Sequence, residues 1–167
     1  MTPEYRRLDR ARRRPALGLI GEWEVLPDFA AVNFHKPAAL EVARLRLLLD
    51  KGIAVEAGIW DVAAAERLRG SGLASDCLRL LLEPAQTPGD AQTQLHGIKA
   101  ALADVKNPRL LHGFGAAAWA FIELAARRGY DTRVGLEDTL VLPDGTRAWD
   151  NAELVAMAWR ILDQQKP

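Results

Sequence analysis

The sequence predicts an α/β fold of repeated strand–helix units around a parallel sheet. Short apolar or β-branched runs, each of a length typical of a strand, alternate with longer stretches whose apolar residues recur every three or four positions. The short runs begin at positions 29, 53, 77, 109 and 131, so the unit recurs at a nearly regular interval. Each helix must carry the chain back to start a strand beside the previous one, and this arrangement requires a parallel sheet.

The elements follow in order along the chain. Five strands are predicted, over Phe29–His35, Ile53–Ile59, Cys77–Glu83, Arg109–Gly113 and Asp131–Gly135. Helices are predicted over Ala38–Lys51, Val62–Ser71, Asp90–Val105 and Ala116–Arg128, with a last helix after Asp150.

Residues with known terminal preferences support these boundaries. We expect N-caps at Asp61, Thr87 and Asp150. Thr87 precedes a proline, which is favoured in the first turn of a helix. Left-handed glycines are expected to end three helical stretches, at Gly52, Gly72 and Gly129.

Two architectures are compatible with this pattern. One is an open, doubly wound sheet, and the other is a (β/α)8 barrel, which typically needs about 250 residues. Only five strands are evident in 167 residues. The sequence therefore predicts either an open sheet or part of a barrel.

Composition narrows the classes of function. The 22 Lys and Arg residues balance the 22 Asp and Glu residues, which removes the electrostatic argument for a nucleic-acid or anionic-membrane partner and favours a small molecule. No apolar stretch approaches the roughly 18 residues of a membrane span. Cys77 is the single cysteine, so no intrachain disulfide can form, and we expect a cytoplasmic protein. We divide the chain into a basic segment, 1–22, helical or frayed, and a βα domain, 23–167.

Polar side chains recur at the ends of the predicted strands, where parallel α/β folds collect their chemistry. Glu56 stands inside an apolar strand, where an unpaired charge is costly, and this favours a functional role. Glu83, before a proline, is interpreted as a loop carboxylate. His35 and His112 are interpreted as packing or hydrogen-bonding residues, because no H-x-H or Cys/His cluster accompanies them.

The densest group of charged residues is Arg133-Val-Gly-Leu-Glu-Asp138, after the last predicted strand. It combines a potential metal ligand, a proton acceptor and a permanent cation within one turn. The cation could keep Asp138 ionised or bind a substrate carboxylate through a bidentate contact. An exposed ion pair in a turn is the structural alternative.

This stretch resembles the signature of the β-keto acid cleavage enzyme family. The similarity extends in collinear order over residues 23–163, and R-x-G-L-E-D followed by N-A-E-L-V is its most specific part. The matching segments are 26–35, 55–60, 110–113, 131–140, 142–145 and 150–155.

The resemblance implies a zinc-dependent (β/α)8 barrel that exchanges fragments between a β-keto acid and acetyl-CoA, giving acetoacetate and a new CoA thioester. It implies that Glu137 ligates zinc and that Asp138 and Arg133 act in proton transfer and substrate orientation. Glu56 is matched to an acidic residue that lines the site. The chain matches about the last five strands, which implies an N-terminally shortened barrel.

One feature departs from the family. The other metal ligands of the family form an H-x-H pair on an early strand, and this sequence has no such pair. Removing three βα units would also expose on the order of ten apolar side chains at roughly 1.5–3 kcal/mol each. We therefore expect a homo-oligomer or a barrel completed by another chain. The alternatives are an open sheet, or a gap filled by the N-terminal residues Leu17, Leu19, Ile20 and Trp23.

Three functions follow as expectations. The first is acetyl-CoA-dependent β-keto acid cleavage, which makes the chain an enzyme by resemblance. The second is a non-catalytic remnant or interaction subunit with the same fold, favoured by the missing H-x-H pair. The third is an unrelated phosphate-binding protein that uses Gly113 and Gly115.

Overall fold

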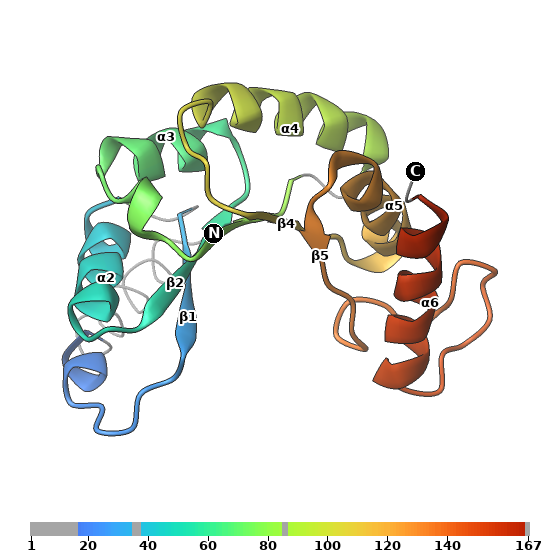
Figure 1. Ribbon diagram of the computed structural model, residues 1–167, viewed down its shortest axis with the longest axis horizontal. Coiled ribbons are helices and arrows are strands. Elements are labelled where there is room, and N and C mark those ends of the chain that lie inside the picture. Colours follow the sequence, from blue (N-terminus) through green and yellow to red (C-terminus); the bar gives the residue numbers. More distant parts are fainter. Residues whose placement is uncertain (1–16, 35–37, 85–86, 166–167) are drawn as a thin grey trace, which may run out of the picture.

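The chain folds into one arched, five-stranded parallel sheet (Figure 1). The computed structural model describes residues 17–34, 38–84 and 87–165. The strands are β1 (Phe29–Asn33), β2 (Ala54–Ile59), β3 (Arg79–Leu82), β4 (Arg109–Leu111) and β5 (Asp131–Thr132). They pair in the order β1-β2-β3-β4-β5, all parallel. This sequential order is that of a partial (β/α)8 barrel and excludes the doubly wound alternative.

A helix follows each strand, as predicted. The helices are α2 (Ala38–Asp50), α3 (Val62–Gly70), α4 (Pro88–Ala101), α5 (Ala118–Arg128) and α6 (Asn151–Gln164), with short 3-10 turns at Ala74–Asp76 and Gly115–Ala117. Every predicted element is present, but β3, β4 and β5 are each two or three residues shorter than expected and α4 ends four residues early. None of the described helices combines the length and apolar character that a bilayer crossing requires.

The predicted caps are mostly confirmed. Asp61 accepts a hydrogen bond from Ala64 N at 2.7 Å, and Asp150 accepts one from Glu153 N at 2.9 Å. Thr87 occupies the N-cap position of α4, but its hydroxyl donates to Asp90 Oδ2 at 2.6 Å and caps no backbone N–H. The prediction of a side-chain cap was wrong there, because a nearby carboxylate competes for the hydroxyl.

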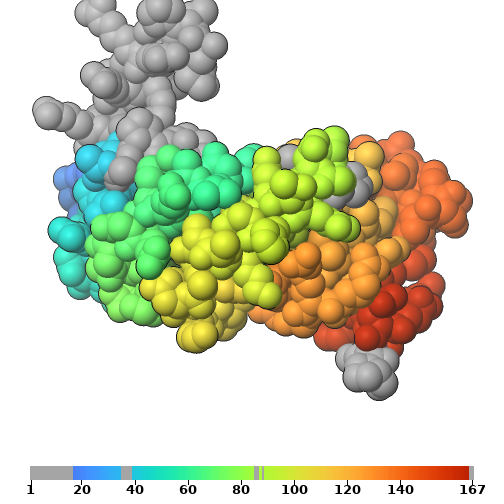
Figure 2. Space-filling model, turned by 90° about the horizontal axis from the view of Figure 1, so that it is seen from above, coloured from blue at the N-terminus to red at the C-terminus, as the bar shows by residue number. Residues whose placement is uncertain are grey.

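The hydrophobic core lies between the sheet and its helices. Alternate strand residues enter it, including the fully buried Val32, Val55, Leu80 and Leu111. Helices α2 to α5 lie along the outer side of the arch (Figure 1), as right-handed crossovers in a sequentially ordered sheet require. The outer surface accordingly runs in sequence order from the blue end to the red end of the molecule (Figure 2).

The opposite face of the sheet is the inside of the arch. The strand residues between the core positions point there. They include the charged Glu56 and Arg79 as well as apolar residues such as Leu81 and Leu110, and the same alternation places Glu83 and His112, which directly follow β3 and β4, on this face. Among the described residues, β1 and β5 each pair with one neighbouring strand and not with each other, so the barrel is open.

The described part of the N-terminal segment packs on the outside of the fold. Residues 17–21 form a helical turn, Ile20 joins the outer core, and Lys51 Nζ donates to Gly21 O at 2.9 Å. Leu19 and Trp23 remain 59% and 40% exposed. The described part of this segment therefore does not fill the space between β1 and β5, and the prediction that it fills the gap was wrong for these residues. The arginines of the basic segment lie outside the described residues.

Candidate functional site

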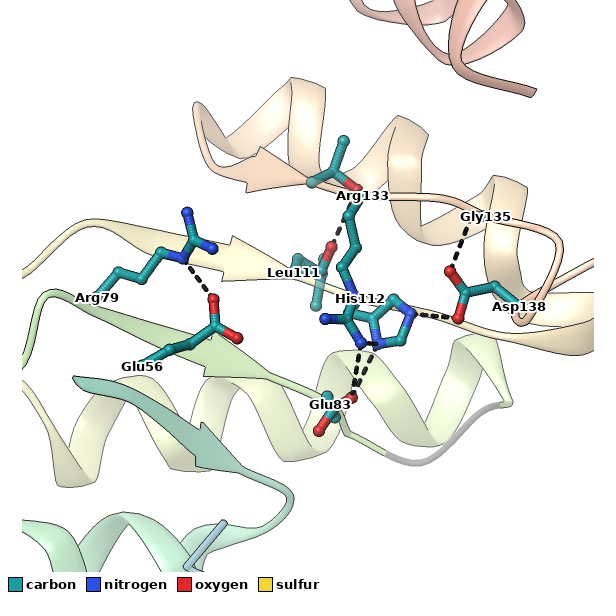
Figure 3. A network of polar contacts seen from close by, with 9 residues as sticks. Glu56, Arg79, Glu83, Leu111, His112, Arg133, Gly135 and Asp138 are labelled. Atoms are coloured by element: carbon teal, nitrogen blue, oxygen red, sulfur yellow. Dashed lines mark hydrogen bonds and ion pairs between the residues drawn. The ribbon is translucent and has the colours of Figure 1, made fainter. Parts of the chain in front are cut away.

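Three adjacent strand ends bring their polar side chains together on the inner face. The register pairs Leu82 of β3 with Leu111 of β4, so the residues that follow, Glu83 and His112, lie side by side. Leu111 is in turn paired with Thr132 of β5, which places Arg133 beside His112. The loop after β5 supplies Asp138 from the other side of the imidazole (Figure 3). We call Glu83, His112, Arg133 and Asp138 the carboxyl-end cluster.

The histidine is held between two carboxylates. His112 Nδ1 lies 2.8 Å from Glu83 Oε1, and His112 Nε2 lies 2.7 Å from Asp138 Oδ1. All three side chains are at least nine-tenths buried. Arg133 Nη2 lies 3.2 Å from Nδ1 of the same ring and 3.9 Å from Glu83 Oε1.

A tight loop fixes the position of Asp138. Its Oδ2 accepts a hydrogen bond from Gly135 N at 3.0 Å, and its backbone N–H donates to Gly135 O at 2.9 Å. Its carbonyl oxygen accepts a hydrogen bond from Gly115 N at 2.7 Å, which connects this loop to the turn that follows β4. Both carboxylate oxygens of Asp138 therefore have donors, and the side chain is held toward the imidazole.

This geometry favours a doubly protonated imidazole. A neutral ring has one N–H, so one of the two carboxylates would face a nitrogen lone pair, whereas the imidazolium donates to both. Arg133 Nη2, 3.2 Å from Nδ1, is the one described neighbour that favours a neutral Nδ1, since a guanidinium can only donate. Burial, the largest single influence, lowers the pKa of His112, and the charge of Arg133 also lowers it. The hydrogen bonds to Glu83 and Asp138 outweigh them, and the pKa of His112 is raised above its ordinary value of 6.5. Two cations then balance two carboxylates in the cluster.

Arg133 is the member of the cluster that solvent reaches. Its side chain is 45% exposed, whereas those of Glu83, His112 and Asp138 are 8% exposed or less. A guanidinium can bind a carboxylate through two parallel hydrogen bonds. The cluster can therefore bind an anion at Arg133 next to a buried, hydrogen-bonded imidazole and carboxylate that can hold or move a proton.

Glu56 lies on the same face but belongs to a separate pair. Its carboxylate is 2% exposed and accepts a hydrogen bond from Arg79 Nε, and the Arg79 guanidinium stacks 5.2 Å from the centre of the Phe29 ring. Glu83 is four residues beyond Arg79 along the β3 direction, a separation of roughly 13 Å along a strand. The structure thus joins Arg133 and Asp138 in one cluster and places Glu56 apart from it (Figure 3).

The side chain of Glu137 lies at the surface, whereas that of Asp138 is buried in the carboxyl-end cluster. Glu137 is exposed, and its carboxylate lies over Gly135, where an added Cβ would be 2.2 Å from Oε2. Among residues 17–34, 38–84 and 87–165, no group of three His, Cys, Asp or Glu side chains could hold a metal ion. Both ring nitrogens of His112 already face carboxylates. The described donors therefore do not form a zinc site on their own. His35 lies outside the described residues.

Two further features bear on the alternatives. The phosphate-binding interpretation requires the backbone N–H of Gly115 as a donor to the ligand. In the structure this N–H donates to the backbone carbonyl of Asp138. Two neighbouring cavities of about 550 and 420 Å3 share Val105, Lys106 and Asn107. They lie at the amino ends of β3 to β5 and contain no member of the carboxyl-end cluster. In barrel folds this end contributes to stability, and the chemistry takes place at the carboxyl end.

The interpretation of His112 as a hydrogen-bonding residue and of Glu83 as a loop carboxylate is confirmed. What the sequence did not indicate is that the two side chains contact each other. Glu83 and His112 each directly follow a strand, and the last residues of these two strands, Leu82 and Leu111, are paired. Residues at equivalent positions of neighbouring parallel strands lie side by side, so this equivalence was the signal that could have linked them.

Comparison with known protein families agrees with the observed fold. Residues 27–166 match the family model described as beta-keto acid cleavage enzyme. No curated protein matches the chain. The matched range includes all five strands and every member of the carboxyl-end cluster.

Proposed function

Because the chain belongs to the beta-keto acid cleavage enzyme family, we propose that it exchanges acyl groups between a β-keto acid and acetyl-CoA. The bond between the keto carbon and the adjacent methylene breaks, and the released acyl group forms a thioester with CoA. The acetyl group joins the remaining CH2–COO⁻ fragment to form acetoacetate. The observation that carries this proposal is the carboxyl-end cluster, which combines an accessible cation with a buried imidazole between two carboxylates.

Each member of the cluster has a distinct part in the proposed reaction. Arg133 binds the carboxylate of the β-keto acid, which orients the keto group toward the interior of the arch. Asp138 accepts a proton from the substrate or returns one to it, and His112 donates to Asp138 Oδ1 and keeps this oxygen in position. Glu83 stabilises the imidazolium from the opposite side. No step is derived from a metal ion, because the described donors do not assemble a site for one.

The test is an exchange assay on the full chain. Purified protein is incubated with acetyl-CoA, carbon-13 labelled in the acetyl group, and a panel of β-keto acids, and labelled acetoacetate and the new thioester are measured by mass spectrometry. Asp138→Asn should lower the rate by about 100-fold or more, because general acid–base catalysis contributes about 10²–10⁴. Asp144→Asn is the matched control, since Asp144 is an exposed turn residue whose oxygen accepts from Thr146, as an asparagine oxygen can.

A non-catalytic role is the second candidate, and the incomplete set of metal ligands favours it. It predicts a folded chain that forms neither product with any β-keto acid, with or without added zinc. Exchange by the wild type that is lost in Asp138→Asn and kept in Asp144→Asn would exclude it. Equal exchange by all three proteins would instead contradict the assignment of the site.

A further inference from the structure

The two ends of the arch carry most of the exposed large apolar side chains. At one end, the segment leading into β1 exposes Leu19, Trp23, Val25, Leu26 and Phe29 by 40–90%. At the other end, α6 and the loop before it expose Leu140, Val141, Trp149, Val155 and Trp159 by 43–91%. We call these sets the β1 end and the α6 end. They lie at the two feet of the arch (Figure 1).

Each end also lacks the neighbour that a barrel would provide. The helix α6 packs against α5 through its Leu154 and Ala158 stripe, and Val155 and Trp159, four residues apart, form an adjacent exposed stripe. In a closed barrel this side of the last helix would contact another βα unit. The strands β1 and β5 are the edges of the sheet, with backbone groups that no other described strand pairs.

We propose that two copies of this chain associate head to tail, with the α6 end of each packed against the β1 end of the other. In this arrangement the edge of β5 in one copy faces the edge of β1 in the other, which continues the parallel order of the sheet. Two such contacts related by a two-fold axis close a ring and leave neither end exposed. This assembly is independent of the proposed reaction.

Contact between two identical ends is less favourable than the head-to-tail contact because it leaves the other kind of end uncovered, and for two β1 ends it is also opposed by charge. Residues 17–29 contain Glu22, Glu24 and Asp28 and no Lys or Arg, and all three carboxylates are exposed. Packing two β1 ends together would bring three carboxylates against three others, which opposes association. Two α6 ends in contact would in turn leave every β1 end exposed. Charge alone does not select the α6 end, where residues 140–164 hold four carboxylates and two cations, Arg147 and Arg160.

The exposed apolar area is of the size that an interface requires. Trp149 and Trp159 are 91% and 57% exposed. At about 150–250 Å2 for each aromatic side chain, these two residues alone offer roughly 200–370 Å2. A standard interface buries about 800 Å2 on each partner, of which about 57% is apolar. Leu140, Val141 and Val155 add to the exposed apolar area of the two tryptophans. The total exposed apolar area of the α6 end therefore approaches the apolar area that one partner buries in such an interface.

The test uses one matched substitution at each end. Analytical ultracentrifugation of the wild-type chain should give a dimer, twice the 18.4 kDa of the monomer. Val25→Glu and Val155→Glu each place a charge in both contacts of the ring, and each should raise the dissociation constant by about 100-fold or more. Val62→Glu, an exposed valine at the start of α3, should leave the dimer unchanged. Circular dichroism and thermal unfolding verify that each variant is folded.

Mixing the two variants tests the head-to-tail arrangement. A pair made of one Val25→Glu chain and one Val155→Glu chain contains one unaltered contact, so an equimolar mixture should recover dimer that neither variant forms alone. A monomeric wild type, or an assembly that grows beyond two copies, would overturn the closed ring. Loss of the dimer in Val155→Glu but not in Val25→Glu would overturn the head-to-tail contact, and so would a mixture that stays monomeric.

Discussion

Replacing His112 with leucine should lower the free energy of unfolding by about 3–5 kcal/mol. The imidazole is the hydrogen-bond partner of both Glu83 and Asp138, which are 6% and 8% exposed. Its removal leaves two buried carboxylates close together with no cation between them, whereas a typical domain is stable by only about 5–15 kcal/mol. Urea denaturation at pH 7, followed by circular dichroism, measures the effect.

Two further variants identify the cause of this loss. His96→Leu is the control, because His96 is an exposed residue of α4, and it should change stability by no more than about 0.5 kcal/mol. Adding Glu83→Gln to His112→Leu should restore part of the lost stability, because it removes one of two like charges that lie close together and leaves only one buried carboxylate beside Arg133. A cost below about 1 kcal/mol for His112→Leu would contradict the imidazolium bridge.

Replacing Arg133 with glutamine should lower kcat/KM for the β-keto acid by about 100-fold, with most of the loss in KM. The reason is that truncating one partner of a charged hydrogen-bonded pair typically costs about 2–5 kcal/mol. Arg133→Lys should be intermediate, since lysine keeps the charge but cannot form two parallel hydrogen bonds to a carboxylate. Steady-state kinetics in the exchange assay separates the two parameters.

The matched control for Arg133 is Arg127→Gln. Arg127 lies on α5, where it forms an exposed pair with Glu123 at 3.5 Å, and its loss should leave the kinetics unchanged. Equal kinetics for Arg133→Gln and Arg127→Gln would show that the cluster does not receive the substrate carboxylate.

Most of the fold could be predicted from the sequence because its signals are local. Strand and helix periodicity identified all five strands and the helices α2 to α6, and Asp61, Asp150 and the left-handed Gly129 marked real boundaries. The limits of β5 could not be predicted in this way. The chain leaves the sheet after Thr132 and enters a tight loop, in which Gly135 N–H donates a hydrogen bond to Asp138 Oδ2. This hydrogen bond depends on the folded loop and is not visible in the periodicity of the strand.

The candidate site could be predicted only in part. The short spacing of Arg133 and Asp138 indicated that they act together, and the structure joins them through His112. Glu83 and His112 are 29 residues apart, so their contact depends on strand register and not on any local motif. Glu56 was interpreted as a site residue on the basis of its burial, but the arginine that pairs with it, Arg79, is 23 residues further along the chain.

The same limit applies to the edges of the sheet. Sequence periodicity shows that strands exist but not whether the first and last of them meet. Five units with the curvature of a barrel cannot close, so β1 and β5 remain edges, and apolar side chains such as Val25 and Trp149 stay exposed beside them. This geometry is the basis of the proposed head-to-tail dimer.

If the carboxyl-end cluster binds a β-keto acid beside a protonated His112, both the charge of the imidazole and its response to the ligand can be observed. Nitrogen-15 NMR of histidine-labelled protein tests both most directly, with the His112 resonances assigned from a His112→Gln variant and His96 as the internal reference. We expect His112 to lose its proton only at a higher pH than an ordinary imidazole does, because its pKa is raised by the hydrogen bonds to Glu83 and Asp138. We also expect a β-keto acid to shift the His112 resonances saturably and to leave those of His96 unchanged. A His112 ring that is neutral at pH 6.5 would exclude the imidazolium bridge, and a ring that does not respond to millimolar β-keto acid would exclude binding of the substrate at this cluster.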